Sequence, residues 1–426
     1  MTGVLARLAL TSGAMLSPAI SWAQAIGARN SIVVEPDLDR DDVAGSRKEP
    51  AYQPQPTLIG PVYVQPSLSV VAGYNTNVFN RPDERKAASV FVTPALDLRA
   101  NLARHDLRLS AVGNIRRFEK YTTENSEEFA LVGRGRYDLG EKDAITTLAE
   151  YSHRIEPRSS AGSVPDAAEP VSYARLVGEL GTTFRWGAVR LAPSAHYDRI
   201  RYNAVAVTDG SEVDQSFRDT RSLRGGVRID YNVSGLVSAF VSGSYDDMKS
   251  PSAPLERKRD ARTATFTAGI RGEISPVISG EIGIGYQSRN YAQPDYQDIQ
   301  GLTYRADVQW YVTPLVTLRA EAARAFRNSG IRQVGGILTD DVALTAYYDP
   351  LRNLRLSLSA SAEFADYREV DARTWRGGMR FQAQYRMSPA ISIGGYAAIE
   401  KQDVDGFQVA NQFTSATVGI GITVTP

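Results

Sequence analysis

The sequence predicts an all-β protein: a transmembrane, up-and-down antiparallel β-barrel of about 18 strands. Two observations support this prediction. From Val62 to the end of the chain, apolar and polar residues alternate with a period of two, and short turns alternate with longer polar connections. Alternation at 180° per residue gives strands with one apolar and one polar face. Short turns that alternate with long loops are the layout of outer-membrane barrels.

The segment 353–367 shows the period of two most clearly. Its apolar series is Leu354, Leu356, Leu358, Ala360, Ala362 and Phe364, and its polar series is Arg355, Ser357, Ser359, Ser361 and Glu363. Segments 106–120 and 277–291 follow the same pattern, and no long segment has the 3.6-residue spacing of a helix. A barrel in lipid exposes one series to the membrane and the other to its lumen, so we expect the apolar series outside.

Turns and loops divide the chain into strand segments. Gly, Pro, Asp and Ser mark the short turns, for example at Gly187 and Thr313-Pro314, and longer polar stretches such as 203–218 lie between them. The predicted strands are 62–79, 88–102, 106–120, 127–139, 143–155, 171–186, 188–202, 219–232, 236–249, 260–273, 277–291, 300–312, 315–327, 337–348, 353–367, 371–386, 390–402 and 410–425. Sixteen strands remain as an alternative if the segments 62–79 and 337–348 are not strands.

The N-terminal part differs from the rest of the chain. Arg7, the mostly apolar run 8–20 and the small-x-small sequence Ala23-Gln24-Ala25 have the form of an export signal, so we predict a signal peptide at 1–25. Residues 26–61 are acidic and interrupted by prolines, and we expect a disordered periplasmic N-terminal tail there. The outer-membrane barrel is then 62–426, with the N- and C-termini in the periplasm.

The composition argues against several function classes. The chain has 426 residues with 48 basic and 48 acidic side chains, and this balance argues against nucleic acid as a partner. It has no cysteine and only three histidines, which lie on separate segments, so we expect no metal and no cofactor. Ser194, His196 and Asp198 lie in a row on one strand face and therefore do not converge as a catalytic triad does. We expect that the protein is not an enzyme.

Arginine dominates the charges of the predicted inner face. Only 7 of the 48 basic residues are lysine. The lumen-lining candidates for contact with a polymer or solute are Arg108, Arg116, Arg134, Arg136, Arg224, Arg228, Arg376 and Arg380. The first four lie on adjacent strands with few acids nearby. Two interpretations stay open: these arginines pair with carboxylates and line a wet lumen, or they form a track for an anionic solute through bidentate contacts.

The opening of the predicted barrel carries a short motif. Its matching positions are Pro66, Leu68, Tyr74, Asn75, Asn77, Val78 and Phe79. This segment resembles a family of β-barrel porins with the opening P-x-L-x-x-x-x-x-Y-(N/D)-x-N-(V/I)-(F/Y), known from proteobacterial gene clusters for exopolysaccharide or capsule synthesis. The resemblance implies an eighteen-stranded barrel that acts as the outer-membrane exit for polymer, alongside a periplasmic polysaccharide-export protein.

Together these features predict a transport channel in the outer membrane of a Gram-negative bacterium, surrounded by membrane lipid and lipopolysaccharide. We expect its transported substrate to be a secreted, acidic polysaccharide, so that its function is exopolysaccharide export. Two alternatives stay open: a diffusion porin for small solutes, and a structural or adhesive barrel whose lumen is plugged.

Overall fold

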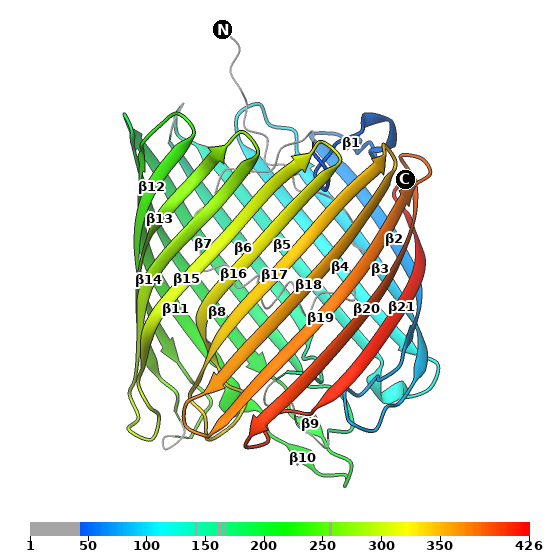
Figure 1. The fold of residues 1–426 in the computed structure, drawn as a ribbon, viewed down its shortest axis with the longest axis vertical. Helices are drawn as coiled ribbons and strands as arrows, with labels where there is room; N and C mark the ends of the chain where they lie inside the picture. The colour runs from blue at the N-terminus through cyan, green and yellow to red at the C-terminus, as the bar shows by residue number, and fades with distance from the viewer. Residues whose placement is uncertain (1–42, 141–142, 161–163, 165–166, 255–257) are drawn as a thin grey trace.

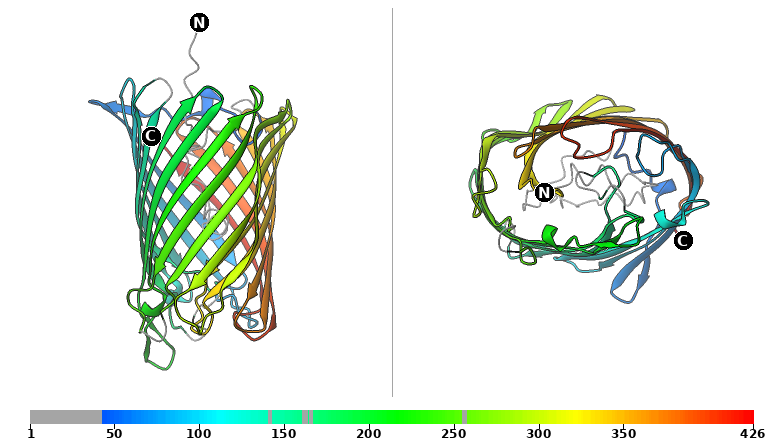
Figure 2. Two further views of the ribbon diagram at one scale, coloured as in Figure 1. Left: turned by 90° about the vertical axis from the view of Figure 1, so that its left-hand side faces the viewer. Right: turned by 90° about the horizontal axis from the view of Figure 1, so that it is seen from below.

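The computed structural model describes residues 43–140, 143–160, 164, 167–254 and 258–426. In this part of the chain, 18 antiparallel strands form one sheet that closes on itself as a barrel (Figure 1, Figure 2). The predicted all-β, up-and-down barrel is confirmed. Among these residues no helix has the length and apolar character needed to cross a membrane. The predicted signal peptide lies outside the described residues.

Each barrel strand pairs with the next one along the chain. The strands are β2 (Val62–Asn75), β3 (Ala87–Ala100), β4 (Asp106–Phe118), β5 (Ser126–Asp138), β6 (Ala144–Ile155), β7 (Ser172–Trp186), β8 (Val189–Tyr202), β11 (Thr220–Asn232), β12 (Val237–Lys249), β13 (Ala261–Ser275), β14 (Ile278–Tyr291), β15 (Ile299–Thr313), β16 (Val316–Asn328), β17 (Gly336–Leu351), β18 (Leu354–Tyr367), β19 (Ala372–Arg386), β20 (Ile391–Gly406) and β21 (Phe413–Val424). They are 12 to 16 residues long. About 9–11 residues suffice to cross a bilayer, so the strands project beyond the hydrocarbon.

All of the predicted strand segments are strands in the structure. The segment 337–348 is β17, which is longer than predicted because its pairing with β16 and β18 continues at both ends. The segment 62–79 is β2, which ends at Asn75 because the chain turns away there. The eighteen-strand prediction is therefore confirmed, and the sixteen-strand alternative is wrong.

The apolar series lies on the outer face. Leu358 and Phe364 of β18 are 46% and 49% exposed. Their neighbours point inward: the Ser359 hydroxyl lies 3.1 Å from the Thr345 hydroxyl, and Glu363 pairs with an arginine of β19. Exposed apolar side chains on every strand need lipid around them, and the polar series lines a lumen, as the period of two predicts.

The two ends of the barrel differ. The end that we call the short-turn end carries the tight connections β3–β4, β5–β6, β7–β8, β11–β12, β13–β14, β15–β16, β17–β18 and β19–β20. Gly187, in the two-residue turn between β7 and β8, has a φ of 57°, which favours glycine and suits such a hairpin. The opposite end, which we call the loop end, carries the longer connections, and the C-terminus lies at the short-turn end (Figure 1).

Small elements lie within the loop-end connections. The β4–β5 connection contains η2 (Thr122–Glu124). The β8–β11 connection, predicted as the loop 203–218, contains the hairpin β9 (Val205–Ala206) and β10 (Glu212–Val213), followed by η3 (Ser216–Arg218). These elements give the loop end a defined shape.

The barrel closes where β2 meets β21. The pairing of these strands ends at Asn75, which is opposite Thr417. Just beyond it, the fully buried Asn77 donates from its side-chain amide to the backbone carbonyls of Thr414 (3.0 Å) and Arg81 (2.7 Å). Asn77 thereby ties the end of the first barrel strand to the start of the last one. The Asn-x-Asn part of the opening motif has a structural role at this seam.

Residues 43–47 lie against the inner wall at the short-turn end. Gly45 has a φ of 90° and packs so closely on the ring of Tyr347 that a Cβ atom there would lie 2.8 Å from it. The Gly45 N–H donates to Asp349 (3.3 Å), and Arg47 donates to a carbonyl in the β15–β16 turn (2.7 Å). This stretch of chain therefore occupies part of the lumen at the short-turn end.

The rest of the described N-terminal segment leads to the barrel wall. It contains η1 (Pro50–Tyr52) and the short strand β1 (Thr57–Ile59), which pairs with the start of β2. Residues 26–42 of the expected disordered tail lie outside the described residues. The boundary at Val62, where β2 begins, separates this segment from the barrel.

Arginine on the outer face should destabilise the barrel. Leu358→Arg or Ile282→Arg should each lower the free energy of unfolding by about 2–4 kcal/mol, because the charge then lies near the middle of the bilayer. Denaturant titration of the barrel folded in lipid vesicles measures this loss. Ser357→Arg on the inner face is the control and should cost far less. Equal losses would mean that the assigned faces are wrong.

Removing the seam amide should weaken closure. Asn77→Ala removes the buried amide that two part-buried hydrogen bonds to backbone carbonyls depend on, so we expect a loss of about 1–3 kcal/mol in the same titration. Asn101→Ala, at an exposed turn residue, should leave the midpoint unchanged. An unchanged midpoint for Asn77→Ala would show that the seam does not depend on this side chain.

Candidate functional site

The eight candidate arginines all lie on the inner face of the barrel. In β4, the side chain of Leu109 points outward and is 49% exposed. Arg108 and Arg116 lie an odd number of residues from Leu109 in the same strand, so their side chains point to the lumen. The other candidates follow the same rule in β5, β11 and β19: Arg134, Arg136, Arg224, Arg228, Arg376 and Arg380. The structure thus places these side chains around the lumen on four strands.

Five of the eight arginines pair with carboxylates. The pairs are Arg108 with Asp106 (2.6 Å), Arg136 with Asp138 (2.9 Å), Arg224 with Asp246 (3.2 Å), Arg228 with Asp230 (2.9 Å) and Glu281 (3.0 Å), and Arg376 with Glu363 (2.9 Å). Arg108 and Arg136, for which few nearby acids were expected, each pair with an acid two residues away. Residues i and i+2 of a strand share a face, which brings these charges together.

The other three, Arg116, Arg134 and Arg380, form no ion pair within 4.0 Å with any of the described residues. Arg134 is exposed to the lumen, and Arg116 and Arg380 are half-buried in its wall. One guanidinium nitrogen of Arg116 and one of Arg380 have no hydrogen-bond partner within the described part of the chain. These two nitrogens are themselves buried in the wall, so what the three arginines contribute to the lumen is positive charge without a carboxylate partner among the described residues.

Aromatic rings hold two of these guanidinium groups. Arg116 lies 4.7 Å from the ring centre of Phe91, and Arg380 lies 4.9 Å from that of Tyr396. Phe91 and Tyr396 belong to one buried cluster on the inner wall near the seam. At Gly419 a Cβ atom would lie 2.4 Å from the Tyr396 ring, so glycine there lets the ring lie against the wall. A ring face attracts a cation without neutralising its charge.

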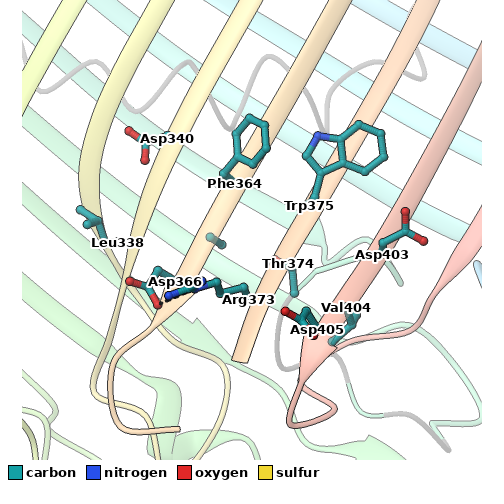
Figure 3. Close-up of a pocket in the computed structure, with 11 residues that line it drawn as sticks. Leu338, Asp340, Phe364, Asp366, Arg373, Thr374, Trp375, Asp403, Val404 and Asp405 are labelled. Atoms are coloured by element: carbon teal, nitrogen blue, oxygen red, sulfur yellow. Dashed lines mark ion pairs between the residues drawn. The ribbon is translucent and has the colours of Figure 1, made fainter. Parts of the chain in front are cut away.

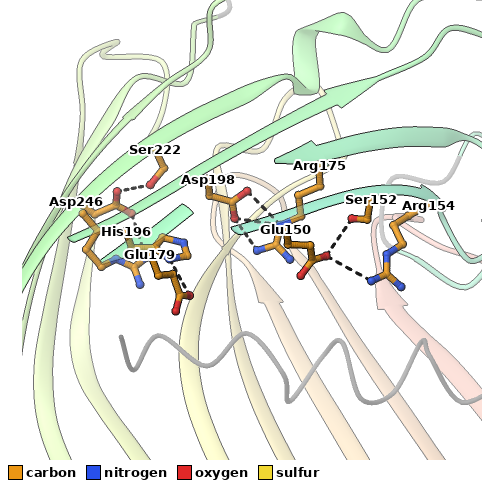
Figure 4. A network of polar contacts seen from close by, with 10 residues as sticks. Glu150, Ser152, Arg154, Arg175, Glu179, His196, Asp198, Ser222 and Asp246 are labelled. Carbon is orange, nitrogen blue, oxygen red and sulfur yellow. Dashed lines mark hydrogen bonds and ion pairs between the residues drawn. The ribbon is translucent and has the colours of Figure 1, made fainter. Parts of the chain in front are cut away.

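Another part of the wall, from β6 to β12, carries a network of neutralised charges (Figure 4). Arg175 pairs with Asp198 (2.7 Å), Glu150 accepts from Ser152 (3.0 Å) and Arg154 (3.5 Å), His196 contacts Glu179 (3.1 Å), and Ser222 contacts Asp246. Each acid here has a partner. This part of the lumen is polar, and its acids are held in ion pairs or hydrogen bonds.

The row of Ser194, His196 and Asp198 does not form a catalytic triad. His196 contacts Glu179, Asp198 pairs with Arg175, and the Ser194 hydroxyl donates to a backbone carbonyl of β11 (3.3 Å). Each of the three side chains has a separate partner, because side chains in a row on a strand do not converge. The described residues also contain no group of three or more His, Cys, Asp or Glu side chains that would hold a metal ion.

Two buried ion pairs join the connections at the loop end. Arg158 pairs with Glu124 (2.5 Å), which links the β6–β7 and β4–β5 connections. Arg218 pairs with Glu156 (2.5 Å), which links the β8–β11 and β6–β7 connections. Burial lowers the pKa of Arg218, but the charge and hydrogen bonds of Glu156 outweigh this effect, so the pKa lies above its usual value. Three connections are thereby tied into one assembly.

A second assembly involves Arg259 of the β12–β13 connection. Its guanidinium donates to the backbone carbonyls of Ser329 and Ile331, in the β16–β17 connection. Arg259 and Arg332 both lie over the ring of Phe217, at 5.4 and 4.9 Å from its centre. Burial lowers the pKa of Arg259. The connections on this side of the loop end are also held together by arginine.

The β6–β7 connection reaches into the lumen. Arg376, on the inner face of β19, donates to the hydroxyl of Ser159 in this connection (3.4 Å). Strands β6 and β19 are far apart around the barrel, and connections are seen inside the ring of strands in the end-on view (Figure 2). The lumen is therefore narrowed at the loop end.

Sequence reasoning missed the residues that shape the mouth and the two rings beneath the arginines. They are Glu124, Glu156, Arg158, Arg218, Phe91 and Tyr396. The rings had a detectable signal, because each is an aromatic residue in the inward series of its strand. The loop residues had none, because an irregular connection has no period from which its partners follow.

The fold and the charged lumen define a transmembrane β-barrel of the porin class. The family described as "Putative beta-barrel porin 2" matches residues 49–425. The chain belongs to this family, which confirms the resemblance seen at Pro66–Phe79. The protein is accordingly an outer-membrane channel, and the family match extends over the whole barrel.

Several solved structures are similar in fold. The siderophore receptor PirA from Acinetobacter baumannii has 8% identity and a TM-score of 0.45, with 85% of this chain and 80% of that one covered. The ferric enterobactin receptor PfeA from Pseudomonas aeruginosa has 9% identity and a TM-score of 0.46, with 85% and 81% covered. OccK3 from Pseudomonas aeruginosa has 11% identity and a TM-score of 0.45, with 85% and 96% covered. No curated protein matches the sequence.

Breaking a mouth ion pair should widen the channel. Glu156→Gln leaves Arg218 buried without its carboxylate, which costs on the order of 3–5 kcal/mol and should separate the β6–β7 and β8–β11 connections. We expect a higher single-channel conductance in planar bilayers. Glu127→Gln, which removes an exposed outer-face partner of Arg117, is the control. If both variants conduct like the parent protein, these connections do not limit the flow.

Proposed function

We propose that the protein is the outer-membrane exit for a secreted acidic polysaccharide. The observation that supports this proposal best is the set Arg116, Arg134 and Arg380, whose guanidinium groups face the lumen without a carboxylate partner in the described part of the chain. A guanidinium binds a carboxylate through two parallel hydrogen bonds. A chain of uronic-acid-type sugars presents such carboxylates at regular intervals.

The mixture of paired and unpaired charges on the inner wall favours passage of the polymer over tight binding of it. In water a cation and an anion about 4 Å apart attract by about 1 kcal/mol, which is enough to favour entry and too little to trap a polymer. The paired arginines, such as Arg228 between Asp230 and Glu281, keep most of the wall neutral. The polymer then meets a few cations instead of a continuous positive surface. The proposal involves no covalent chemistry.

The proposal includes an orientation. Outer-membrane barrels have short periplasmic turns and longer external loops, so the short-turn end faces the periplasm and the loop end faces outward. A periplasmic polysaccharide-export protein would meet the short-turn end, beside the segment 43–47. Polymer would enter there and leave past the narrowed mouth.

The narrowed mouth favours a second candidate, a diffusion porin for small solutes. The contact between Ser159 and Arg376 leaves less room for a polymer than an unobstructed barrel would. If the mouth never opens, the structural or adhesive barrel is the third candidate. The polymer-exit proposal requires the β6–β7 connection to move aside during export.

Anion selectivity tests the role of the three arginines. In planar bilayers with a salt gradient, the parent protein should prefer anions, and the preference should weaken as salt screens the lumen over about 10 Å at 0.1 M. Replacement of Arg116, Arg134 and Arg380 by Gln should reduce this preference. Arg117→Gln is the matched control, because Arg117 neighbours Arg116 in sequence but faces outward and pairs with Glu127.

Secretion in cells separates the candidate functions. Deletion of the protein, or the triple Gln variant at normal abundance, should lower the amount of extracellular polysaccharide. If the deletion strain secretes normal polymer and instead loses permeability to small solutes, the export proposal fails and the porin candidate stands. Absence of conductance even for Glu156→Gln would favour the plugged barrel.

A further inference from the structure

A separate set of cations lies on the outer face at the loop end. Arg199 and Arg201 face outward from the end of β8, and Arg221 faces outward from the start of β11. Arg199 and Arg221 are directly opposite each other, and Lys249 of β12 is opposite Arg221. We call Arg199, Arg201, Arg221 and Lys249 the outer arginine patch. It spans three neighbouring strands.

The three arginines of the patch have no acid partner in the described residues. Like charges directly opposite on a sheet destabilise it, so an uncompensated row of this kind indicates a ligand. The carboxylate of Asp219, which is near in sequence, is occupied: it accepts from the Tyr202 N–H (2.8 Å) and the Ser252 hydroxyl (2.7 Å). Within the patch only Lys249 pairs with carboxylates, those of Asp247 and Asp260.

Elsewhere at the loop end, outward cations of the strands do have partners. The pairs are Arg117 with Glu127, Arg262 with Asp247, Arg324 with Asp340, Arg373 with Asp366, and Lys401 with Asp403. Strands β17 to β20 lie on another side of the barrel from the outer arginine patch, and there aspartates outnumber the outward cations. These aspartates line a hollow beside Trp375 (Figure 3). Among the described strand residues, the excess of outward positive charge at the loop end is therefore confined to one side of the barrel.

The patch lies at the edge of the apolar band. The outward neighbours of the arginines toward the short-turn end are Leu223 (61% exposed) and Tyr197, and Leu176 (43% exposed) is opposite Arg199. Next along β12 comes Tyr245 (52% exposed). Tyrosine prefers the level of the lipid headgroups. The arginines therefore lie at or just beyond the headgroups, where anionic groups of the membrane are within reach.

We propose that the outer arginine patch binds the phosphate groups of lipopolysaccharide in the outer leaflet. This inference rests on the orientation in the proposed function, with the loop end facing outward. The lipid of that leaflet carries phosphates at the headgroup level and acyl chains beneath them. An arginine side chain can donate two hydrogen bonds to one phosphate group. Leu176, Leu223 and Tyr245 offer an apolar surface to the acyl chains.

Binding of lipid A by the purified full-length chain tests the proposal. Diphosphoryl lipid A is titrated into the detergent-solubilised barrel, and bound lipid is counted by native mass spectrometry. The test variant replaces Arg199, Arg201 and Arg221 by Gln, and the control replaces the paired Arg117, Arg262 and Arg373 by Gln. We expect the test variant to bind lipid A about tenfold more weakly than the parent, which corresponds to about 1.4 kcal/mol. The control should keep parental affinity.

Titrations with other lipids and with inorganic phosphate define the ligand. Monophosphoryl lipid A should bind less tightly than the diphosphoryl form, and phosphatidylglycerol and inorganic phosphate should bind weakly. If the test variant binds lipid A as tightly as the parent protein does, the proposal is wrong. It is also wrong if the parent protein binds phosphatidylglycerol and lipid A equally tightly. A test variant that conducts like the parent is folded, so its lipid result stands.

Two further readouts separate this inference from the proposed function. One outcome is that the parent protein and the test variant bind lipid A equally, while anion selectivity still depends on Arg116, Arg134 and Arg380. In that case only the proposal for the outer arginine patch is refuted. Labelling of an Asp209→Cys variant in intact cells with a membrane-impermeant maleimide reports the orientation, because Asp209 lies exposed in the β8–β11 connection. Absence of labelling would place the loop end in the periplasm. This result would refute both the proposed orientation and the proposed lipid site.

Discussion

The structure depends on one constraint: inside the hydrocarbon, every backbone N–H and C=O group needs a partner within the protein. Hairpin neighbours meet this requirement locally. The seam between β2 and β21 is the exception, because it joins residues more than three hundred positions apart, such as Asn77 and Thr414. Closure there removes the two free edges that the sheet would otherwise expose to lipid. The asparagine motif at the opening of the barrel thus supports the closure of the sheet around the lumen.

Charges in the lumen follow from this geometry in two ways. Residues two apart on a strand share a face, which gives pairs such as Arg108 with Asp106, and residues opposite each other on neighbouring strands give pairs such as Arg224 with Asp246. Arginine satisfies several acceptors at once with its planar fork, whereas lysine acts as a compact point charge. Where no described carboxylate lies within ion-pair distance, an aromatic ring contacts the guanidinium, as Phe91 does beneath Arg116. The wall therefore remains well packed even where its charge is not neutralised.

The strands and their faces could be predicted because the period of two is a local property. β18 shows this: each of its residues from Leu354 to Phe364 lies on the predicted side. Partners across the lumen could not be predicted, because they join distant parts of the chain: Arg158 and Glu124 are 34 positions apart, and Arg376 and Ser159 are 217 apart. No local pattern contains those contacts.

Arg116 and Arg117 show how strictly the closed sheet separates two environments. They are consecutive and chemically identical, yet Arg116 lies over Phe91 in the lumen and Arg117 pairs with Glu127 on the outer face. A shift of β4 by one residue would exchange them and would also turn Leu109 into the lumen. The energetic cost of exposing polar residues to lipid along a whole strand excludes that shift. A charge distribution that differs between the two faces is therefore stable, and the same residue type can carry separate positive sites in the lumen and on the outer surface.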